Sequence, residues 1–351
     1  MLLHKMKTKT LIILVVLIGL GAGGFFVAKK FGPPGGLPRE GGPPREIKSE
    51  IREPADLSQV TSFYHASDPD WSPGGNRLVF EGIAEEGEDV GLYLINADGS
   101  GLTKIGSDHN PSWSPVDNRI LLRDDCRGGC SLILIDLDKG WENKVRLASQ
   151  INEQGSWSPD GKKIAYSSSD GLIWIMNSDG SGKTALTTNE DGNCMAPSFS
   201  YDGSKIVYLK GLVSYAVGAA GIEPNEVWTM NADGSNKHQI YAPGNSAQLI
   251  FQRPWNKDNK IIFMRTWYRG NYPQIWVMNS DGSDPRLLVS GEGAFGDPVW
   301  DNTDTKVACS KAPLLSITGS NIWRSNIWMF SYEEPKGILQ TIWEKILNFL
   351  K

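Results

Sequence analysis

One recurring pattern constrains the fold of this chain more than any other feature. The pattern is an aromatic residue, a tight turn, a short apolar strand, a connection, a second strand with Trp, and Asn-x-Asp-Gly-Ser. Its best copy runs from residue 155 to residue 187 and reads GSWSPDGKKIAYSSSDGLIWIMNSDGSGKTALT. The residues that lead the copies stand 42 to 56 positions apart and are Trp71, Trp113, Trp157, Phe199, Trp255 and Trp300. Such periods are typical of propeller blades. The repeat therefore predicts an all-β fold, a six-bladed β-propeller of four-stranded antiparallel blades.

The turn residues within each copy favour this interpretation. In Ser158-Pro159-Asp160-Gly161 the proline suits the second turn position, and the glycine accepts the positive φ that closes the turn. The following strand, residues 172–176, is apolar at every position instead of alternating, as expected for a sheet covered on both faces.

The PxWSPDG and NxDGS spacings resemble the TolB-type six-bladed propeller repeat over residues 58–332. The motifs are specific in copies one, three and four. Copy two has Asp136-Leu137-Asp138-Lys139-Gly140 in place of NxDGS, and copies five and six keep only the Trp of the WSPDG motif. The TolB family also carries an α/β domain before its propeller. Residues 1–57 are too short and too rich in Gly and Pro to supply that domain, so the resemblance implies a membrane-anchored variant without it.

Ring closure can also be predicted. Copy six reaches Glu333-Glu334-Pro335 without a fourth strand, whereas residues 59–64 stand just before copy one. We expect residues 59–64 to supply the missing strand beside copy six.

The amino-terminal segment predicts export. Residues 1–10 form a basic leader, expected on the cytoplasmic side, and residues 11–28 form an uncharged run just long enough to cross a bilayer. A cleaved signal peptide is the alternative, although the run is longer than the usual signal core. Residues 29–57 form a Pro/Gly-rich linker. Both interpretations place the propeller outside the cytoplasm.

Charge excludes one class of partner. Residues 1–48 hold eight Lys or Arg against two Glu, which leaves the rest of a chain of net charge −5 strongly acidic. A nucleic-acid surface needs a basic face, so nucleic acid is not an expected partner.

The connections between second and third strands lengthen in copies four, five and six, and they should share one face of the ring with the inter-blade connections. Tyr, Trp and Arg are the residue types that anchor protein interfaces. The candidate partner-binding residues are Tyr215, Trp267, Tyr268, Arg269, Tyr272, Trp323 and Arg324. The alternative is that they only pack the long loops onto the propeller.

Four acidic residues and one histidine should reach the same face from the inter-blade connections: Asp108, His109, Glu190, Asp191 and Asp297. They form a patch for a cation or a basic partner, with Asp108, His109, Asp191 and Asp297 as weak metal candidates. Solvated loop charges are the plainer interpretation, and no cofactor is expected.

Enzymatic motifs are scarce. The sequence has no G-x-S-x-G elbow and no hydrolase domain after the propeller, as the peptidases with a similar propeller have. The three histidines of the propeller are far apart in sequence, unlike the histidine cluster of propeller lyases with a similar repeat.

The cysteines divide into two pairs. Cys126 and Cys130 flank the tip of the copy-two hairpin and predict a disulfide, which suits an oxidising exterior. Cys194 and Cys309 belong to different blades and should be buried free thiols.

Residues 338–350 within the tail 333–351 repeat apolar positions with a helical period, so a short amphipathic helix is expected. It could dock on the propeller, on a membrane or on a partner.

Together these features predict a membrane-tethered, extracytoplasmic propeller scaffold. It should bind a protein partner in the cell envelope through its long-loop face. The alternative is a propeller enzyme, a hydrolase or lyase, with its site at the mouth of the central channel.

Overall fold

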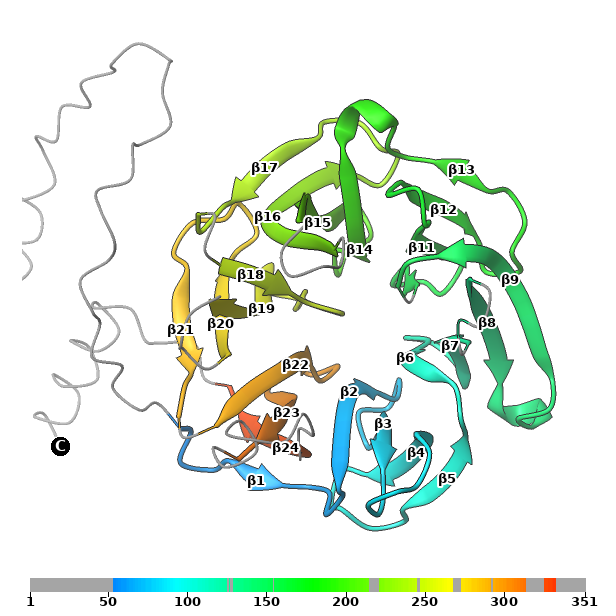
Figure 1. Ribbon diagram of the computed structural model, residues 1–351, viewed down its shortest axis with the longest axis vertical. Helices are drawn as coiled ribbons and strands as arrows, with labels where there is room; N and C mark the ends of the chain where they lie inside the picture. The colour runs from blue at the N-terminus through cyan, green and yellow to red at the C-terminus, as the bar shows by residue number, and fades with distance from the viewer. Residues whose placement is uncertain are drawn as a thin grey trace, which may run out of the picture. The chain divides into compact units, whose positions relative to one another are not determined.

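The computed structural model describes residues 53–332, except 125, 127–128, 154, 215–220, 245–246, 268–272, 292 and 314–324. These residues form six four-stranded antiparallel sheets arranged in a ring (Figure 1). The predicted six-bladed propeller is therefore confirmed. The expected helices at 11–28 and 338–350 lie outside the described residues. Within the described part no helix is long and apolar enough to cross a membrane.

The first three blades follow the repeat in sequence order. Blade 1 contains β2 (His65–Trp71), β3 (Arg77–Ile83), β4 (Gly91–Asn96) and β5 (Thr103–Gly106). Blade 2 contains β6 (His109–Trp113), β7 (Arg119–Arg123), β8 (Cys130–Asp136) and β9 (Lys144–Ile151). Blade 3 contains β10 (Ser156–Trp157), β11 (Lys163–Ser167), β12 (Ile173–Asn177) and β13 (Thr184–Ala185).

The last three blades are built in the same way. Blade 4 contains β14 (Asn193–Phe199), β15 (Lys205–Ser214), β16 (Gly221–Asn231) and β17 (His238–Tyr241). Blade 5 contains β18 (Ala247–Ile250), β19 (Lys260–Trp267), β20 (Gln274–Asn279) and β21 (Arg286–Val289). Blade 6 contains β22 (Ala294–Trp300), β23 (Lys306–Ala312), β24 (Asn326–Ser331) and β1 (Ser58–Gln59). The 3-10 helices η1 (Leu137–Lys139) and η2 (Asn189–Asp191) lie in connections.

The amino-terminal strand closes the ring. Ser58 and Gln59 of β1 pair with Met329 and Trp328 of β24. The side chain of Thr61 then continues the contact, because it donates to Asn326 Oδ1 (3.1 Å) and accepts from the backbone N–H of Ile327 (2.9 Å). Residues at the start of the predicted segment 59–64 thus complete blade 6. The strand itself begins one residue earlier and is only two residues long.

The core lies between the blades. One cluster joins blade 5 residues such as Ile262 and Val277 to blade 6 residues such as Phe295 and Trp300. Each blade therefore buries both faces against its neighbours, which explains the uniformly apolar third strands. Two of the leading tryptophans also bond to the preceding blade: Trp157 Nε1 donates to the carbonyl of Ser112 (3.0 Å), and Trp300 Nε1 donates to the carbonyl of Pro254 (2.9 Å).

Strand order gives the ring two distinct ends. The turns between first and second strands meet at one end, where Arg119 bonds to Gly161 O of the next blade and Asn302 bonds to Ser72 O and Pro73 O. We call this end the turn face. The connections between second and third strands and between blades lie at the opposite end, which we call the loop face.

Candidate functional site

The innermost strands of four blades share a β-bulge that shapes the central channel. Strand register shifts at a residue that precedes a proline and has positive φ: Asp68 (52°), Asn110 (50°), Ala196 (50°) and Asp297 (48°). Positive φ is unfavourable for residues other than glycine, and a bulge redirects the side chain it carries. Three of these four residues are polar.

Two carboxylates from these bulges meet at the loop-face end of the channel. The backbone N–H of Asp68 donates to Asp297, whose side chain also accepts from Ser310 Oγ (2.8 Å). Asn110 Nδ2 donates to Asp68 Oδ1 (3.1 Å), and the Gln252 amide bonds to the same oxygen. Burial, reinforced by the charges of Asp297 and Glu81, raises the pKa of Asp68 to about 8. Asp68 is thus protonated over much of the neutral range.

A second pair lies beside this cluster. His109 Nδ1 is 3.2 Å from Glu81 Oε1, and the other carboxylate oxygen accepts from the N–H of Asn110 (3.1 Å). Burial alone would raise the pKa of Glu81, but the hydrogen bond and charge of His109 outweigh it and the pKa is lowered. The same hydrogen bond raises the pKa of His109. The two groups thus favour a charged pair.

An ion pair crosses the middle of the channel. Arg253 Nη1 of blade 5 lies 2.7 Å from Asp70 Oδ1 of blade 1, although blade 6 stands between these blades. The side chain of Asp70 also accepts from the backbone N–H groups of Trp71 (2.9 Å) and Trp113 (2.7 Å). Burial raises the pKa of Asp70, and the guanidinium opposes that rise. Asp70 is 1% exposed, so its charge depends on these partners.

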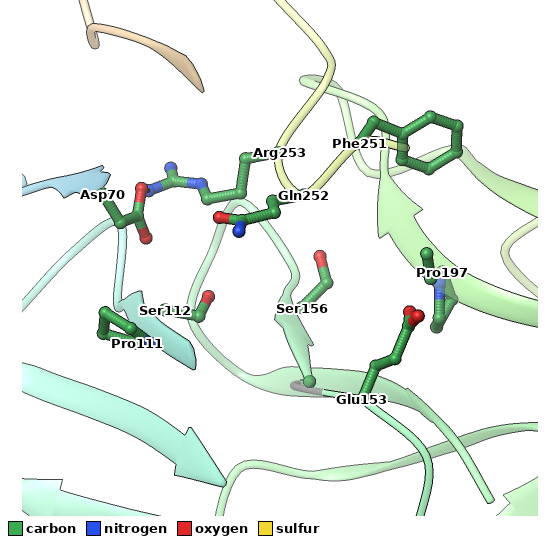
Figure 2. A pocket seen from close by; sticks show the side chains of 11 residues that line it. Asp70, Pro111, Ser112, Glu153, Ser156, Pro197, Phe251, Gln252 and Arg253 are labelled. Atoms are coloured by element: carbon green, nitrogen blue, oxygen red, sulfur yellow. Dashed lines mark hydrogen bonds and ion pairs between the residues drawn. The ribbon is translucent and has the colours of Figure 1, made fainter. Parts of the chain in front are cut away.

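A small cavity of about 20 Å³ lies next to this pair. Figure 2 shows the hydroxyls of Ser112 and Ser156 and the carboxylate of Glu153 directed toward it. Ser112 is 3% exposed, and its hydroxyl has no hydrogen-bond partner among the described residues. Burial raises the pKa of Glu153. A space of this size accommodates little more than a water molecule.

A larger hollow of about 320 Å³ opens at the turn face. We call it the funnel. Its walls come from the repeat motifs of several blades, and Arg253 and Ser156 line both the funnel and the small cavity. The aromatic residues of the wall are Trp157, Phe199, Tyr201, Trp255 and Trp300, and the prolines are Pro73, Pro115 and Pro159. The funnel therefore adjoins the small cavity at Arg253 and Ser156.

The predicted partner-binding residues lie almost entirely outside the described part. Only the backbone of Trp267, the last residue of β19, is described, and Tyr215, Tyr268, Arg269, Tyr272, Trp323 and Arg324 are not. Their role stays a prediction.

The acidic candidates have separate partners. Asp108 pairs with Lys144 (2.5 Å) and Asp191 with Lys237 (3.1 Å), and Glu190 lies exposed in η2. His109 pairs with Glu81, and Asp297 bonds to Ser310. Within the described ranges no group of three or more His, Cys, Asp or Glu side chains is placed to hold a metal ion.

Sequence reasoning named Asp297 but missed the other residues of the channel cluster. Asp68, Asn110, Gln252 and Asp297 all stand three positions before a leading Trp, so aligning the copies on that residue would have grouped them. The same alignment shows Arg253 where most other copies have proline. The ion pair with Asp70 has no such signal, because it joins two blades that are not adjacent in sequence or in space.

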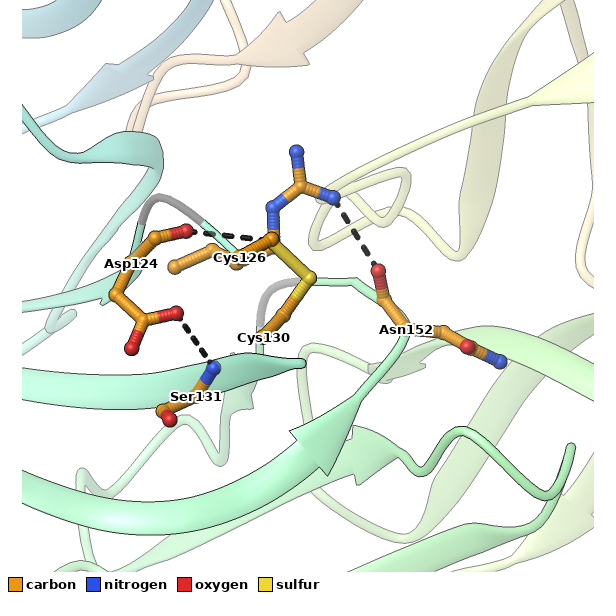
Figure 3. Close-up of a disulfide and its surroundings, with 6 residues drawn as sticks. Asp124, Cys126, Cys130, Ser131 and Asn152 are labelled. Carbon is orange, nitrogen blue, oxygen red and sulfur yellow. Dashed lines mark hydrogen bonds between the residues drawn. A yellow bond between two sulfur atoms is a disulfide. The ribbon is translucent and has the colours of Figure 1, made fainter. Parts of the chain in front are cut away.

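The hairpin tip of blade 2 carries a disulfide. Cys126 and Cys130 are joined with an S–S distance of 2.06 Å, and Asp124 anchors the hairpin through the N–H of Ser131 (2.7 Å; Figure 3). Arg123 Nη1 bonds to the carbonyl of Asn152 in the following connection (3.2 Å), so the tip is tied to blade 3. Cys194 and Cys309 are free and buried, and burial raises the pKa of each thiol.

Residues 50–248, more than half of the chain, match the sequence pattern of the TolB beta propeller domain. The chain belongs to this family. The uncharacterized protein Atu1656 of Agrobacterium fabrum is 22% identical over 259 residues, which is 66% of this chain and 80% of that protein. The TolB-like propeller is also similar in fold to a solved TolB-type protein from Agrobacterium tumefaciens. That similarity has a TM-score of 0.53 at 18% identity and covers 79% of this chain and 97% of that one.

TolB from Acinetobacter baumannii gives a TM-score of 0.51 at 14% identity, over 78% of this chain and 66% of that one. At these identities the solved structures show the fold alone. The expectation of a TolB-like six-bladed propeller is confirmed.

Proposed function

We propose that this TolB-like propeller is tethered to a membrane, faces the extracytoplasmic space, and binds a basic protein partner in the cell envelope through its loop face. The proposal combines the propeller scaffold with the amino-terminal apolar run and the chemistry of the loop face.

The observation that carries the proposal is the long hairpin of blade 4. The inner strand β14 stops pairing at Asn193, opposite Gly211, yet β15 and β16 continue to pair as far as Ser214 and Gly221. The hairpin thus rises beyond its own blade on the loop face. A two-stranded ribbon is only marginally stable alone, and the packing of the blade does not require it to project. Binding of a partner would give this projecting hairpin a role.

Charge supports the choice of a basic partner. The connection between β3 and β4 on the same face exposes Glu85, Glu86, Glu88 and Asp89 within five residues. Complementary charge steers a partner toward such a surface and aligns it.

The start of the described chain supports a tether near this face. Glu53 Oε1 lies 2.8 Å from Lys311 Nζ, close to the loop-face end of β23. A Pro/Gly-rich linker before residue 53 would join the propeller to the apolar run 11–28.

The experiment is cross-linking of the full chain in its own membranes, followed by identification of the cross-linked proteins. Trp267→Ala/Tyr268→Ala should lose the main partner, whereas Leu102→Ala/Val145→Ala, which alters exposed apolar residues away from the long loops, should keep it. An identical partner set for both variants contradicts the proposed face.

The tether has its own measurement. Protease should digest the propeller when it is added to cells whose outer layer has been permeabilised but whose cytoplasmic membrane is intact. Without protease, the full chain should sediment with the membranes. Recovery of an intact, soluble cytosolic chain rules out the tether.

A second candidate function rests on the acids at the loop-face end of the channel. A protonated Asp68 beside the Glu81–His109 pair offers an acid and a base in one place, as an enzyme of the hydrolase or lyase type requires. Turnover of chromogenic ester, phosphate, glycoside or peptide substrates that Asp68→Asn reduces at least about 100-fold supports this function. Turnover that survives the substitution rejects it.

A further inference from the structure

The funnel departs from the blade repeat at the residues that define its base. Arg253 stands where the innermost strands of other blades have Pro69, Pro111, Pro197 and Pro298. The blade architecture therefore does not require an arginine here. Its side chain instead reaches across the axis to Asp70 and lines both the funnel and the small cavity.

The shape of this space restricts what can enter it. About 320 Å³ is available above Arg253, whereas the cavity below holds about 20 Å³. An extended chain that enters along the axis cannot continue past the ion pair. The funnel thus suits the end of a polypeptide better than an internal segment.

Hydrogen-bond donors at the base select which end. Asp301 in the wall accepts from the N–H groups of Thr305 (2.9 Å) and Lys306 (3.0 Å), and Asp304 accepts from the N–H of Lys257 (2.7 Å). Both carboxylates keep their negative charge while they bind their own turns, and Lys257 Nζ lies 4.0 Å from Asp304 Oδ2. Arg253 makes one hydrogen bond, to Asp70, and the other N–H groups of its fork have no partner among the described residues. A guanidinium matches a carboxylate with two parallel hydrogen bonds.

The walls add an apolar contact. Tyr201 replaces the turn proline found in the first three copies and is 55% exposed. Together with the proline and tryptophan side chains it lines an opening in the size range of ligand sites. Aromatic walls favour an apolar last residue.

We propose that the funnel binds the free carboxyl terminus of an extended segment of a partner protein, with the terminal carboxylate on Arg253 and an apolar last side chain against Tyr201 and the tryptophans. This site lies on the turn face, so it goes beyond the loop-face function and does not depend on it.

The test uses the immobilised full chain and pools of synthetic hexapeptides with random internal residues and an apolar last residue. One pool ends in a free carboxylate, and the second ends in an amide. Mass spectrometry of the retained peptides should show at least about tenfold enrichment of free acids over amides, since loss of a charge-assisted fork removes the main polar contact.

Two variants separate binding from folding. Arg253→Lys keeps a cation beside Asp70 but cannot form the fork, and it should reduce retention about tenfold. Arg146→Lys, an exposed arginine of β9, is the matched control and should retain peptides like the wild type. Tyr201→Ala changes an exposed side chain, so it should leave thermal unfolding unchanged while weakening retention.

Four results overturn the proposal. The first three are equal retention of the two pools, no retention of either, and retention that neither Arg253→Lys nor Tyr201→Ala reduces. Retention of amides that contain internal Asp or Glu also overturns it, because the carboxylate then comes from a side chain. Each result leaves the loop-face function untouched, since that function is measured with Trp267 and Tyr268.

Discussion

At the scale of single residues, the channel holds several buried carboxylates that the packing of the blades does not require. Asp68, Asp70 and Asp297 come from innermost strands, where packing alone would accept small or apolar residues such as Ala196. Each carboxylate is hydrogen-bonded, but different neighbouring charges act on the pKa of each one. Asp70 faces a guanidinium, whereas Asp68 faces two other carboxylates.

Asp68→Asn should change how stability depends on pH. The folded-state pKa of Asp68 is about 8 and its ordinary value is 3.8, so the folded protein holds a proton that the unfolded chain releases between these values. The free energy of unfolding of the wild type should therefore fall as pH rises from about 4 to about 8. The variant should lose part of this slope, because burial also raises the pKa of Asp70 and Glu153, and it should be the more stable protein above about pH 8.

Urea unfolding of both proteins at about pH 5, 7 and 9 checks this prediction. Some slope should remain from His109, whose raised pKa stabilises the fold at low pH and is lost as pH rises through it. Parallel pH profiles for wild type and variant contradict the assignment to Asp68.

Arg253→Met should be strongly destabilising because it leaves Asp70 buried and unpaired. Removal of one partner of such a pair costs about 3–5 kcal/mol. The double variant Arg253→Met/Asp70→Asn should recover part of this loss. Chemical denaturation of the four proteins of the cycle measures the coupling, and purely additive losses show that the two side chains do not interact.

At the scale of elements, sequence predicted the blades well because each copy carries its own turn chemistry. In Asn177-Ser178-Asp179-Gly180-Ser181 the Asp179 carboxylate accepts from the N–H and the hydroxyl of Ser181, and Gly180 has a φ of 87°. Four copies repeat this turn, so its local signal is strong. The bulges at Asp68 and Asn110 were not predicted, because X-Pro within a strand signals irregularity but not the direction of the side chain.

Thr61→Val should weaken the closure of blade 6. The hydroxyl is buried and serves as donor to Asn326 and as acceptor from the N–H of Ile327, so the substitution removes two hydrogen bonds and leaves a buried N–H unpaired. A loss of about 1–3 kcal/mol in unfolding free energy is expected. The exposed neighbour Ser62→Val is the control and should stay within about 0.5 kcal/mol of the wild type.

A chain that begins at Asp68 tests closure more severely. It lacks β1, Thr61 and Phe63, which packs in the first-blade core. We expect broad, non-cooperative thermal unfolding in place of a single transition. A sharp transition at the temperature of the full chain shows that the ring does not need this strand.

At the scale of the whole molecule, the sequence repeat predicted the ring of blades but not the side-chain contacts inside the channel. Six similar copies specify the number of blades, but the channel is formed by the ways in which the copies differ. Arg253 reaches Asp70 only after the ring has brought blades 5 and 1 to the same axis. The long loops diverge for the same reason, so their contacts could not be inferred from the repeat.

The redox state of the disulfide at the loop face tests which compartment the propeller occupies. Protein purified from its host without reductant should be about 2 Da lighter at Cys126–Cys130 than reduced protein, since disulfide formation removes two hydrogens. Mass spectrometry of the intact chain with and without reductant measures this. Two free thiols at these positions contradict exposure to an oxidising exterior.

The short strand β1 sets the order in which this protein can be completed. Ser58 and Gln59 leave the ribosome early, but their partners Met329 and Trp328 are synthesised near the end. The ring therefore cannot close until almost the whole polypeptide has been synthesised. A chain that ends before β24 would leave the ring open and its apolar blade surfaces exposed. A cell that makes this protein must protect the unfinished ring during translation.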